Sequence, residues 1–275
     1  MKTDIRLLSA ADIPAAMRLK ELAGWNQTER DWQRLLELEP DGCFAALCDG
    51  RLVGTATTTR FGVELAWIGM VLVDPEYRRR GIATRLMKTA MAYLQSSGVR
   101  TIKLDATPAG QPVYEALGFV LEHRIERQAA TVSASGNLKS SPADITQVMA
   151  LDRTAFAADR SRLISSLYHE ALAQAVVVED SRVLGYALAR SGYKAHYIGP
   201  LVALDGAVAH ALLSNILAQL PAGNVYLDYN TGFTGVDLQR FGFVTQRELF
   251  RMRCGPPLPA GGEEKVVAIA GLEVG

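Results

Sequence analysis

The pattern of apolar and polar positions predicts that strands and helices alternate along the first half of the chain. Short apolar or alternating runs indicate strands at residues 5–8, 43–48, 52–60, 66–73, 101–105 and 119–127. Apolar residues three and four apart indicate helices at 13–19, 28–38, 84–94 and 113–117. The strand at 66–73 is apolar almost throughout, which is typical of a central strand covered on both faces. The predicted order is β-α-α-β-β-β-α-β-α-β.

The second half repeats parts of the same pattern. Pro142 to Ile145 echoes Ala10 to Ile13, and Leu238 to Phe243 ends in the same Gly-Phe corner as Leu117 to Phe119. Strands are predicted at 175–179, 183–190, 195–202 and 224–229, and a helix at 207–220. We interpret the halves as diverged copies of one fold. The alternative is one larger α/β domain with coincidental similarities.

The breaks in this pattern divide the chain into four parts. We expect a first domain at 1–132, a polar linker at 133–140, a second domain at 141–255 and a tail at 256–275. The tail contains a proline- and glycine-rich break and then an apolar strand at about 266–270. Because a lone strand needs a partner, we expect it to pair with a sheet edge, with the first domain as the suggested partner.

Composition restricts the classes of function. The chain has 275 residues, which suits two domains, and its 29 Lys and Arg balance its 29 Asp and Glu. This balance argues against nucleic acid or an acidic membrane as a partner. Three cysteines and four scattered histidines indicate neither a disulfide framework nor a metal site. The first residues show no signal peptide and no run is long enough to span a membrane, so we expect a cytoplasmic protein.

The most informative stretch is the basic loop Arg78-Arg79-Arg80-Gly81-Ile82-Ala83. It follows the apolar strand and an Asp74-Pro75 turn and precedes an amphipathic helix. The unpaired N–H groups and the dipole at a helix start favour an anion, glycine permits close approach, and arginine adds planar donors. The order of residues differs from a Walker loop and from a dinucleotide fingerprint. It predicts a phosphate-binding loop, with a solvated basic helix start as the alternative.

This loop resembles the acyl-CoA loop of the GNAT superfamily of N-acetyltransferases. The match reads Arg78-x-x-Gly81-x-Ala83, and Tyr114-Glu115-Ala116-Leu117-Gly118-Phe119 resembles the family's Tyr-x-x-Leu-Gly-Phe segment. The resemblance covers about residues 4–130. It implies an α/β (α+β) fold of two tandem GNAT-like domains, each a mixed, mostly antiparallel twisted sheet flanked by helices. Thr107 to Gly110 and Ile198 to Leu201 resemble two-domain members with an intact first and a degenerate second domain.

The resemblance implies an acetyl-CoA-dependent N-acetyltransferase that transfers the acetyl group directly to an amine, without a metal. It places the cofactor-binding positions on the central strand, the loop and the following strand: Val71, Leu72, Val73, Arg78, Arg79, Arg80, Gly81, Ile82, Ala83, Thr84 and Thr107. Thr107 stands where relatives often carry an asparagine, so that contact departs from the family pattern. A backbone N–H near Met70 or Val71 is the expected oxyanion donor.

Three residues are candidates for proton transfer. Tyr114 is the expected general acid, because a phenol has a pKa near that of the thiol leaving group. The alternative for Tyr114 is packing with a satisfied hydroxyl. Glu64 and Asp105, next to the ends of neighbouring strands, are candidate bases, and each could instead be a solvated or capping carboxylate.

The acceptor is expected to be a primary amine of a small molecule. Trp25, Asn26 and Trp67 are the candidate acceptor-binding residues, with core or surface packing as the alternative for each. The second half has Asp205 where an anion loop would need positive charge, so it is not expected to hold CoA. It is expected to shape the acceptor pocket or to support a homodimer. Alternative functions are a protein or peptide N-acetyltransferase and a non-catalytic acyl-CoA sensor.

Overall fold

The computed structural model describes residues 3–133, 144–258 and 262–275, and most of the predicted linker at 133–140 lies outside these ranges. The strands are β1 (Thr3–Leu7), β2 (Cys43–Cys48), β3 (Arg51–Phe61), β4 (Leu65–Val73), β5 (Thr101–Ala106), β6 (Val120–Val132), β7 (Ala173–Glu179), β8 (Arg182–Arg190), β9 (His196–Ala203), β10 (Gly223–Asn230), β11 (Val244–Cys254) and β12 (Val266–Ala268). The helices are α1 (Ile13–Leu22), α2 (Glu29–Leu38), α3 (Ile82–Ser96), α4 (Gln111–Glu115), α5 (Ile145–Phe156), α6 (Ser161–His169) and α7 (Gly206–Gln219). The predicted order of elements in the first half is confirmed.

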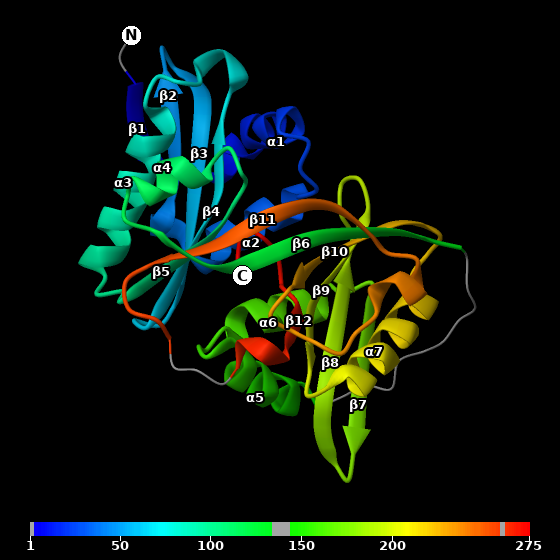
Figure 1. Cartoon of the computed structure of the whole chain (residues 1–275). Coiled ribbons are helices and arrows are strands. Elements are labelled where there is room, and N and C mark those ends of the chain that lie inside the picture. Colours follow the sequence, from blue (N-terminus) through cyan, green and yellow to red (C-terminus); the bar gives the residue numbers. More distant parts are fainter. Residues whose placement is uncertain (1–2, 134–143, 259–261) are drawn as a thin grey trace.

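The first half is a mixed sheet with helices on both faces (Figure 1). Strands β1 to β4 are antiparallel neighbours, and β4 runs parallel to β5. Alternate residues of β2 pack into different cores. Phe44 and Ala46 pack with α3, whereas Cys43 and Ala45 pack with α1 and α2. This alternation places α3 on one face of the sheet and the first two helices on the other.

The second half repeats this arrangement. Strands β7, β8 and β9 are antiparallel, and β9 runs parallel to β10 through Val225 to Leu227. Helix α7 packs with one apolar cluster of the second half, and α5 and α6 belong to another. The expected mixed α/β architecture with two GNAT-like units is therefore present.

The two halves exchange their last strands. Strand β11, from the second half, lies between β5 and β6 of the first, and β6 in turn pairs with β10 of the second half. In Figure 1 the long green and orange strands cross the middle of the molecule side by side. The described strands therefore form one continuous sheet, and each half is completed by a strand from the other.

The tail strand does not pair with a sheet edge, and the expectation of an edge in the first domain is wrong. Strand β12 lies inside the second half, between β9 and β10. After it, residues 269–275 are buried except for the half-buried Leu272, and they reach the first half, where the indole of Trp67 donates a 3.1 Å hydrogen bond to the carbonyl of Leu272. The apolar run correctly predicted a strand. Its apolar side chains are buried in the interior, and the strand does not lie at a sheet edge.

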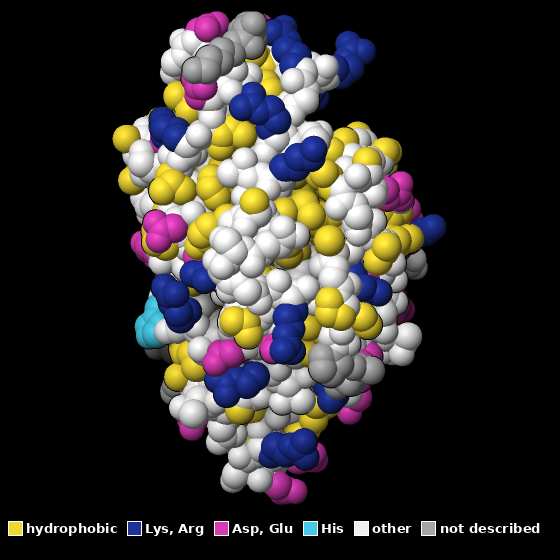
Figure 2. All heavy atoms as spheres, turned by 90° about the vertical axis from the view of Figure 1, so that its left-hand side faces the viewer, with side chains coloured by type: hydrophobic (Ala, Val, Ile, Leu, Met, Phe, Trp, Pro, Cys, Tyr) yellow, Lys and Arg dark blue, Asp and Glu magenta, His cyan; other side chains and the backbone are white. Residues whose placement is uncertain are grey.

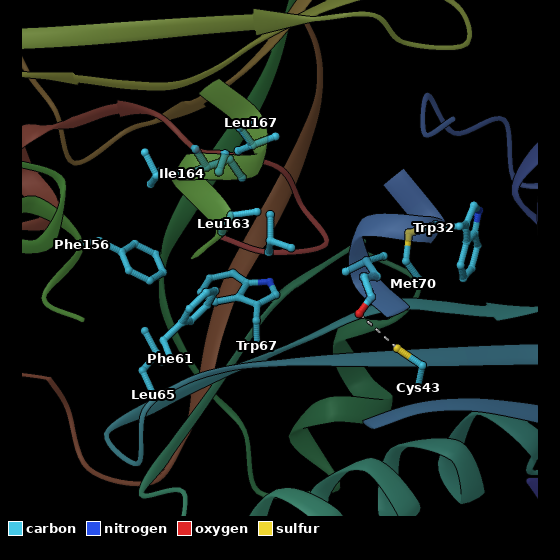
Figure 3. Close-up of a cluster of buried hydrophobic side chains, with 14 of the residues drawn as sticks. Trp32, Cys43, Phe61, Leu65, Trp67, Met70, Phe156, Leu163, Ile164 and Leu167 are labelled. Atoms are coloured by element: carbon cyan, nitrogen blue, oxygen red, sulfur yellow. Dashed lines mark hydrogen bonds between the residues drawn. The ribbon is translucent and has the colours of Figure 1, made fainter. Parts of the chain in front are cut away.

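A shared apolar core joins the two halves. Figure 3 shows Phe61 and Trp67 of the first half facing Phe156 and Leu163 of the second half. The rings of Phe61 and Phe156 meet edge to face with centroids 5.1 Å apart. The two units are thus packed into a single body at the point where the tail arrives.

Candidate active site

Strands β4 and β5 separate half-way along their length. Their pairing extends only from Leu65 opposite Thr101 to Trp67 opposite Lys103. Beyond that point β4 carries a bulge, and Met70 has a φ of 48°. Because β5 no longer pairs with this part of β4, the backbone groups of residues 69–73 that face β5 have no sheet partner there. This is the opening that binding of a pantetheine arm along Val71, Leu72 and Val73 requires.

The loop after β4 leads into the start of α3. Asp74 accepts a hydrogen bond from the N–H of Glu76 and pairs with Arg18 at 2.7 Å, which fixes the turn. Gly81 caps the helix with a φ of 74°, and the N–H of Arg85 donates to its carbonyl. The N–H groups of residues 82–84 precede this first helical hydrogen bond and therefore have no partner within the helix.

Arg78, Arg79 and Arg80 are exposed around this helix start. Arg78 donates through Nε to the carbonyl of Val73 at 3.2 Å, so it stays close to the end of β4. On the face shown in Figure 2, Lys and Arg side chains are scattered rather than gathered in one large patch. The three arginines of the loop are thus a local group of positive charge in a chain whose total charge is balanced.

A cavity of about 60 Å³ lies at the separation of β4 and β5. Its lining comes from both halves and from the tail: Trp25, Gln27, Ile68, Gly69, Met70, Val71, Leu104, Asp105, Thr107, Tyr114, Arg247, Leu249, Leu272 and Glu273. The sequence-based candidates Tyr114, Asp105, Thr107, Val71 and Trp25 are therefore brought together. On this measure one water needs about 10–15 Å³, so the space holds a few waters or a small chemical group of comparable size.

Tyr114 enters this cavity from the short helix α4. Its ring packs edge to face against Phe119, with centroids 6.2 Å apart. Burial raises the pKa of Tyr114 to about 12, so the phenol keeps its proton at neutral pH. The same shift moves its pKa away from that of a thiol, which was the basis for expecting a general acid. Thr107 accepts a 3.2 Å hydrogen bond from the N–H of Gly110 and so holds the turn that begins α4.

The two carboxylates predicted as bases have different surroundings. Glu64 is exposed before the start of β4, pairs with Arg100 at 3.2 Å and does not line the cavity, so its assignment as a base is corrected. Asp105 lines the cavity, but both of its oxygens accept 3.0 Å hydrogen bonds from Arg251. Burial raises the pKa of Asp105, and the guanidinium of Arg251 opposes this effect. Asp105 is therefore held as half of a buried ion pair.

The structure also corrects two of the three acceptor candidates. Asn26 is buried, and its amide bonds to the backbone of Lys194 and Ala195, so it joins the halves instead of facing the cavity. Trp67 is fully buried beneath the tail, with the guanidinium of Arg251 4.5 Å from its ring centre. Trp25 alone of the three lines the cavity.

Several cavity residues carry no signal in the local sequence pattern. Arg247 comes from the exchanged strand β11, and Leu272 and Glu273 come from the tail. One indirect signal is Gly69, in the middle of an apolar strand, because glycine there indicates a close backbone approach. A Cβ at this position would lie 2.6 Å from the carbonyl oxygen of Glu273.

The corresponding region of the second half is filled by the chain itself. Strand β12 occupies the space between β9 and β10, which corresponds to the opening between β4 and β5. At the start of α7, the carboxylate of Asp205 accepts a 2.9 Å hydrogen bond from the N–H of Val208. A side-chain anion thus already takes the position that a phosphate would need.

Comparison with known proteins identifies the family. Residues 13–119 match the acetyltransferase (GNAT) family, and residues 148–266 match a second GNAT acetyltransferase domain. The chain belongs to the GNAT superfamily of acetyltransferases. It is therefore an acetyltransferase of GNAT type, and this family uses acetyl-CoA as the acyl donor.

Individual relatives match across both GNAT domains. Holothin acyltransferase of Pseudoalteromonas sp. (strain SANK 73390) is 27% identical over 91% of this chain and 87% of its own length. The uncharacterized N-acetyltransferase YitH of Bacillus subtilis (strain 168) is 28% identical over 75% of each chain. A Pyrococcus horikoshii protein of known crystal structure has the same fold, with a TM-score of 0.81 and 23% identity over 99% of this chain and 96% of its own.

Two further observations concern the described residues alone. None of their helices combines the length and the apolar character needed to cross a membrane. Their His, Cys, Asp and Glu side chains form no cluster of three or more that could hold a metal ion.

Proposed function

We propose that this GNAT protein transfers the acetyl group of acetyl-CoA directly to the primary amine of a small molecule. The observation that carries the proposal is the cavity at the separation of β4 and β5, which joins the bulge at Met70 to the phenol of Tyr114. The strand that forms one wall of this cavity leads directly to the anion-binding loop before α3. Donor and acceptor would meet in the cavity, where positioning alone contributes about 7–11 kcal/mol in well-oriented cases.

The residues around the opening fit the chemistry of CoA. The diphosphate would accept hydrogen bonds from the N–H groups of residues 82–84, with Arg78 to Arg80 adding positive charge. The amides of the pantetheine arm would pair with the backbone groups of Val71 to Val73 that face away from β3, and the carbonyl of Val73 would be shared with Arg78. Thr107, which lines the same cavity, would lie beside the arm. The second half offers no equivalent opening because β12 fills it.

The reaction needs an oxyanion donor and an acid as well as a neutral amine. Met70 and Val71 lie between the residues of β4 that pair with β3 on either side of the bulge, and a backbone N–H there would stabilise the tetrahedral oxyanion. Tyr114 keeps its proton at neutral pH and would give it to the departing thiolate.

A small acceptor accords with the lining of the cavity and with the relatives. Both halves and the tail line the cavity, so an acceptor must reach the reacting atoms between them. The relative that matches most of both domains is named for the acylation of holothin. We therefore favour a small amine over a protein N-terminus as the acceptor.

Calorimetry and a thiol-release assay test the proposal. Titration with acetyl-CoA should give a single site per chain, because the second half is filled by Asp205 and β12. The thiol-release assay, run with a panel of small amines and short peptides, should show turnover with small amines. Two equivalent sites would contradict the assignment of the second half. Binding without turnover on any amine would favour an acyl-CoA sensor instead.

Replacing Tyr114 with phenylalanine should lower kcat by about 100-fold while the affinity for acetyl-CoA stays within about twofold of wild type. The change removes the proton donor but keeps the ring that packs on Phe119. The matched control is Tyr193→Phe, because Tyr193 is 53% exposed and does not line the cavity. Steady-state thiol release and calorimetry measure the two quantities, and an unchanged kcat in Tyr114→Phe would remove Tyr114 from the mechanism.

A further inference from the structure

The tail places the backbone of Glu273 against the central strand of the first half. Glu273 is 5% exposed, and its backbone lies so close to Gly69 that a Cβ there would approach its Cα to 2.7 Å. The neighbouring carbonyl of Leu272 is held by the indole of Trp67. Glu273 and Leu272 both line the cavity with Tyr114 and Met70. A residue about 200 positions away in the sequence therefore belongs to the proposed acetyl-transfer site.

The carboxylate of Glu273 retains free acceptor positions. Its Oε2 accepts from the amide of Gln27 at 2.7 Å, and its Oε1 accepts from Arg190 at 3.1 Å. The backbone N–H of Glu273 also donates to this carboxylate. A carboxylate oxygen accepts up to two hydrogen bonds, so acceptor capacity remains for a further donor. Asp105, the other carboxylate that lines the cavity, instead accepts two 3.0 Å hydrogen bonds from the same guanidinium.

Asp31 and Glu273 both lie beside Arg190, and their pKa values are shifted in opposite directions. Arg190 lies 3.4 Å from Asp31 as well as 3.1 Å from Glu273. Arg190 and Arg34 lower the pKa of Asp31 although burial opposes them. Burial raises the pKa of Glu273, the charge of Arg190 opposes this effect, and the charge of Asp31 adds to it. Such a separation of pKa values is typical of two carboxyl groups of which one stays charged while the other takes up and releases a proton.

Other charged groups around Glu273 favour a neutral amine in the cavity. Arg247 lines the cavity, and its Nε has no hydrogen-bond partner among the described residues. A guanidinium disfavours an ammonium beside it, so an arriving amine loses its proton more readily. A second, narrower space lies on the other side of Glu273. Apart from Glu273 itself, the ionisable groups that line this space or the cavity are Asp31, Asp105, Tyr114, Arg127, Arg190, Tyr197 and Arg247.

We infer that Glu273, delivered by the tail, is the general base of the acetyl transfer. This assignment rests on the proposed function. The amine nitrogen attacks the thioester carbonyl carbon, the new C–N bond forms, and the C–S bond breaks. The surplus proton of the nitrogen passes to Glu273, and Tyr114 gives its proton to the sulfur. Return of the proton from Glu273 to Tyr114 through water restores both groups.

Glu273→Gln tests the assignment with little change in shape. The new amide carbonyl still accepts from Arg190, and Gln27 can turn its amide so that its own carbonyl, buried without a partner, accepts from the new NH₂ group. The thermal midpoint and the affinity for acetyl-CoA should therefore stay close to wild type. At neutral pH, kcat/KM for the amine should fall by about 100-fold or more.

The pH profile separates a base from a structural carboxylate. Glu273 must be ionised to accept a proton, so wild-type kcat/KM should rise with pH through its pKa, which burial raises above the ordinary value. Glu273→Gln should lose this acid limb and stay slower than wild type at high pH, so the ratio of the wild-type rate to the variant rate should fall as the pH drops below that pKa. Glu273→Asp should recover part of the rate. Glu264→Gln is the control, because Glu264 is an exposed carboxylate of the same segment.

The outcomes distinguish this assignment from the proposed function. A wild-type protein that binds acetyl-CoA but acetylates no amine would overturn both. An active wild type together with a Glu273→Gln variant of similar rate and unchanged pH profile would overturn the role of Glu273 alone. A loss of rate that is equal at every pH would make Glu273 a structural residue and would also reject its role as base.

Discussion

Replacing Gly81 with glutamate should weaken the binding of acetyl-CoA by at least about 100-fold, which corresponds to about 3 kcal/mol. Gly81 has a φ of 74°, and a side chain in this left-handed conformation costs about 1–2 kcal/mol. The new carboxylate would also stand at the helix start where the diphosphate is expected, and like charges there repel. Calorimetry with acetyl-CoA measures the effect.

Gly62→Glu is a matched control for this variant. Gly62 has a φ of 75°, and a Cβ at either glycine would meet no atom within 4 Å. Gly62 lies in the turn before β4, whereas Gly81 lies in the arginine loop after β4. The control variant therefore has the same backbone strain and the same added charge, but at a position remote from the arginine loop. Its thermal midpoint should fall by a similar amount while the affinity for acetyl-CoA stays unchanged. Equal affinity in both variants would show that the diphosphate binds elsewhere.

Local sequence patterns predicted the parts of the site that depend on neighbouring residues. The strand, turn, arginine loop and helix around Gly81 form one continuous segment, so its spacing determines where the free N–H groups lie. The same holds for Tyr114, which a short helix and the Gly118-Phe119 corner place beside the cavity. For these residues, the local sequence was sufficient to predict where they lie.

The incorrect assignments involve partners that are distant in the sequence. Trp67 and Asn26 are near the expected acceptor region, but residues 272 and 194–195 bind their polar atoms. Glu64 stands at the end of β4 that is remote from the bulge. A single strand pattern does not reveal which end or face a distant segment covers, so these residues could not be distinguished from the candidates that line the cavity.

The exchange of strands explains why the base candidate was also hidden. In a tandem protein with separate sheets, each half would complete its own site. Here β11 supplies Arg247 and Leu249 to the first half, and the tail passes between β9 and β10 before it supplies Glu273. The second half therefore contributes walls to a site of the first half, which gives a physical reason for retaining a half that lacks an anion loop.

Because the exchanged strands complete both halves, the first half should not fold alone. In a fragment of residues 1–132, β5 would lose β11, and the 13 residues of β6 would lose both β10 and β11. Two buried apolar residues of β11, Leu249 and Met252, would also be missing from the cores of the first half. Unpaired strands of this length promote aggregation. We expect the fragment to be insoluble, or to unfold without cooperativity and to bind no acetyl-CoA.

Co-expression of residues 1–132 with residues 141–275 provides the control. The second fragment carries β10, β11 and the tail, so the pair can form the same sheet although the chain is cut. The fragments should co-purify as a one-to-one complex that unfolds cooperatively and binds acetyl-CoA with an affinity near that of the intact chain. Size-exclusion chromatography, thermal unfolding and calorimetry measure these properties. A fragment of residues 1–132 that is monomeric, folded and able to bind acetyl-CoA by itself would contradict the exchange, because its sheet would then be complete without β11.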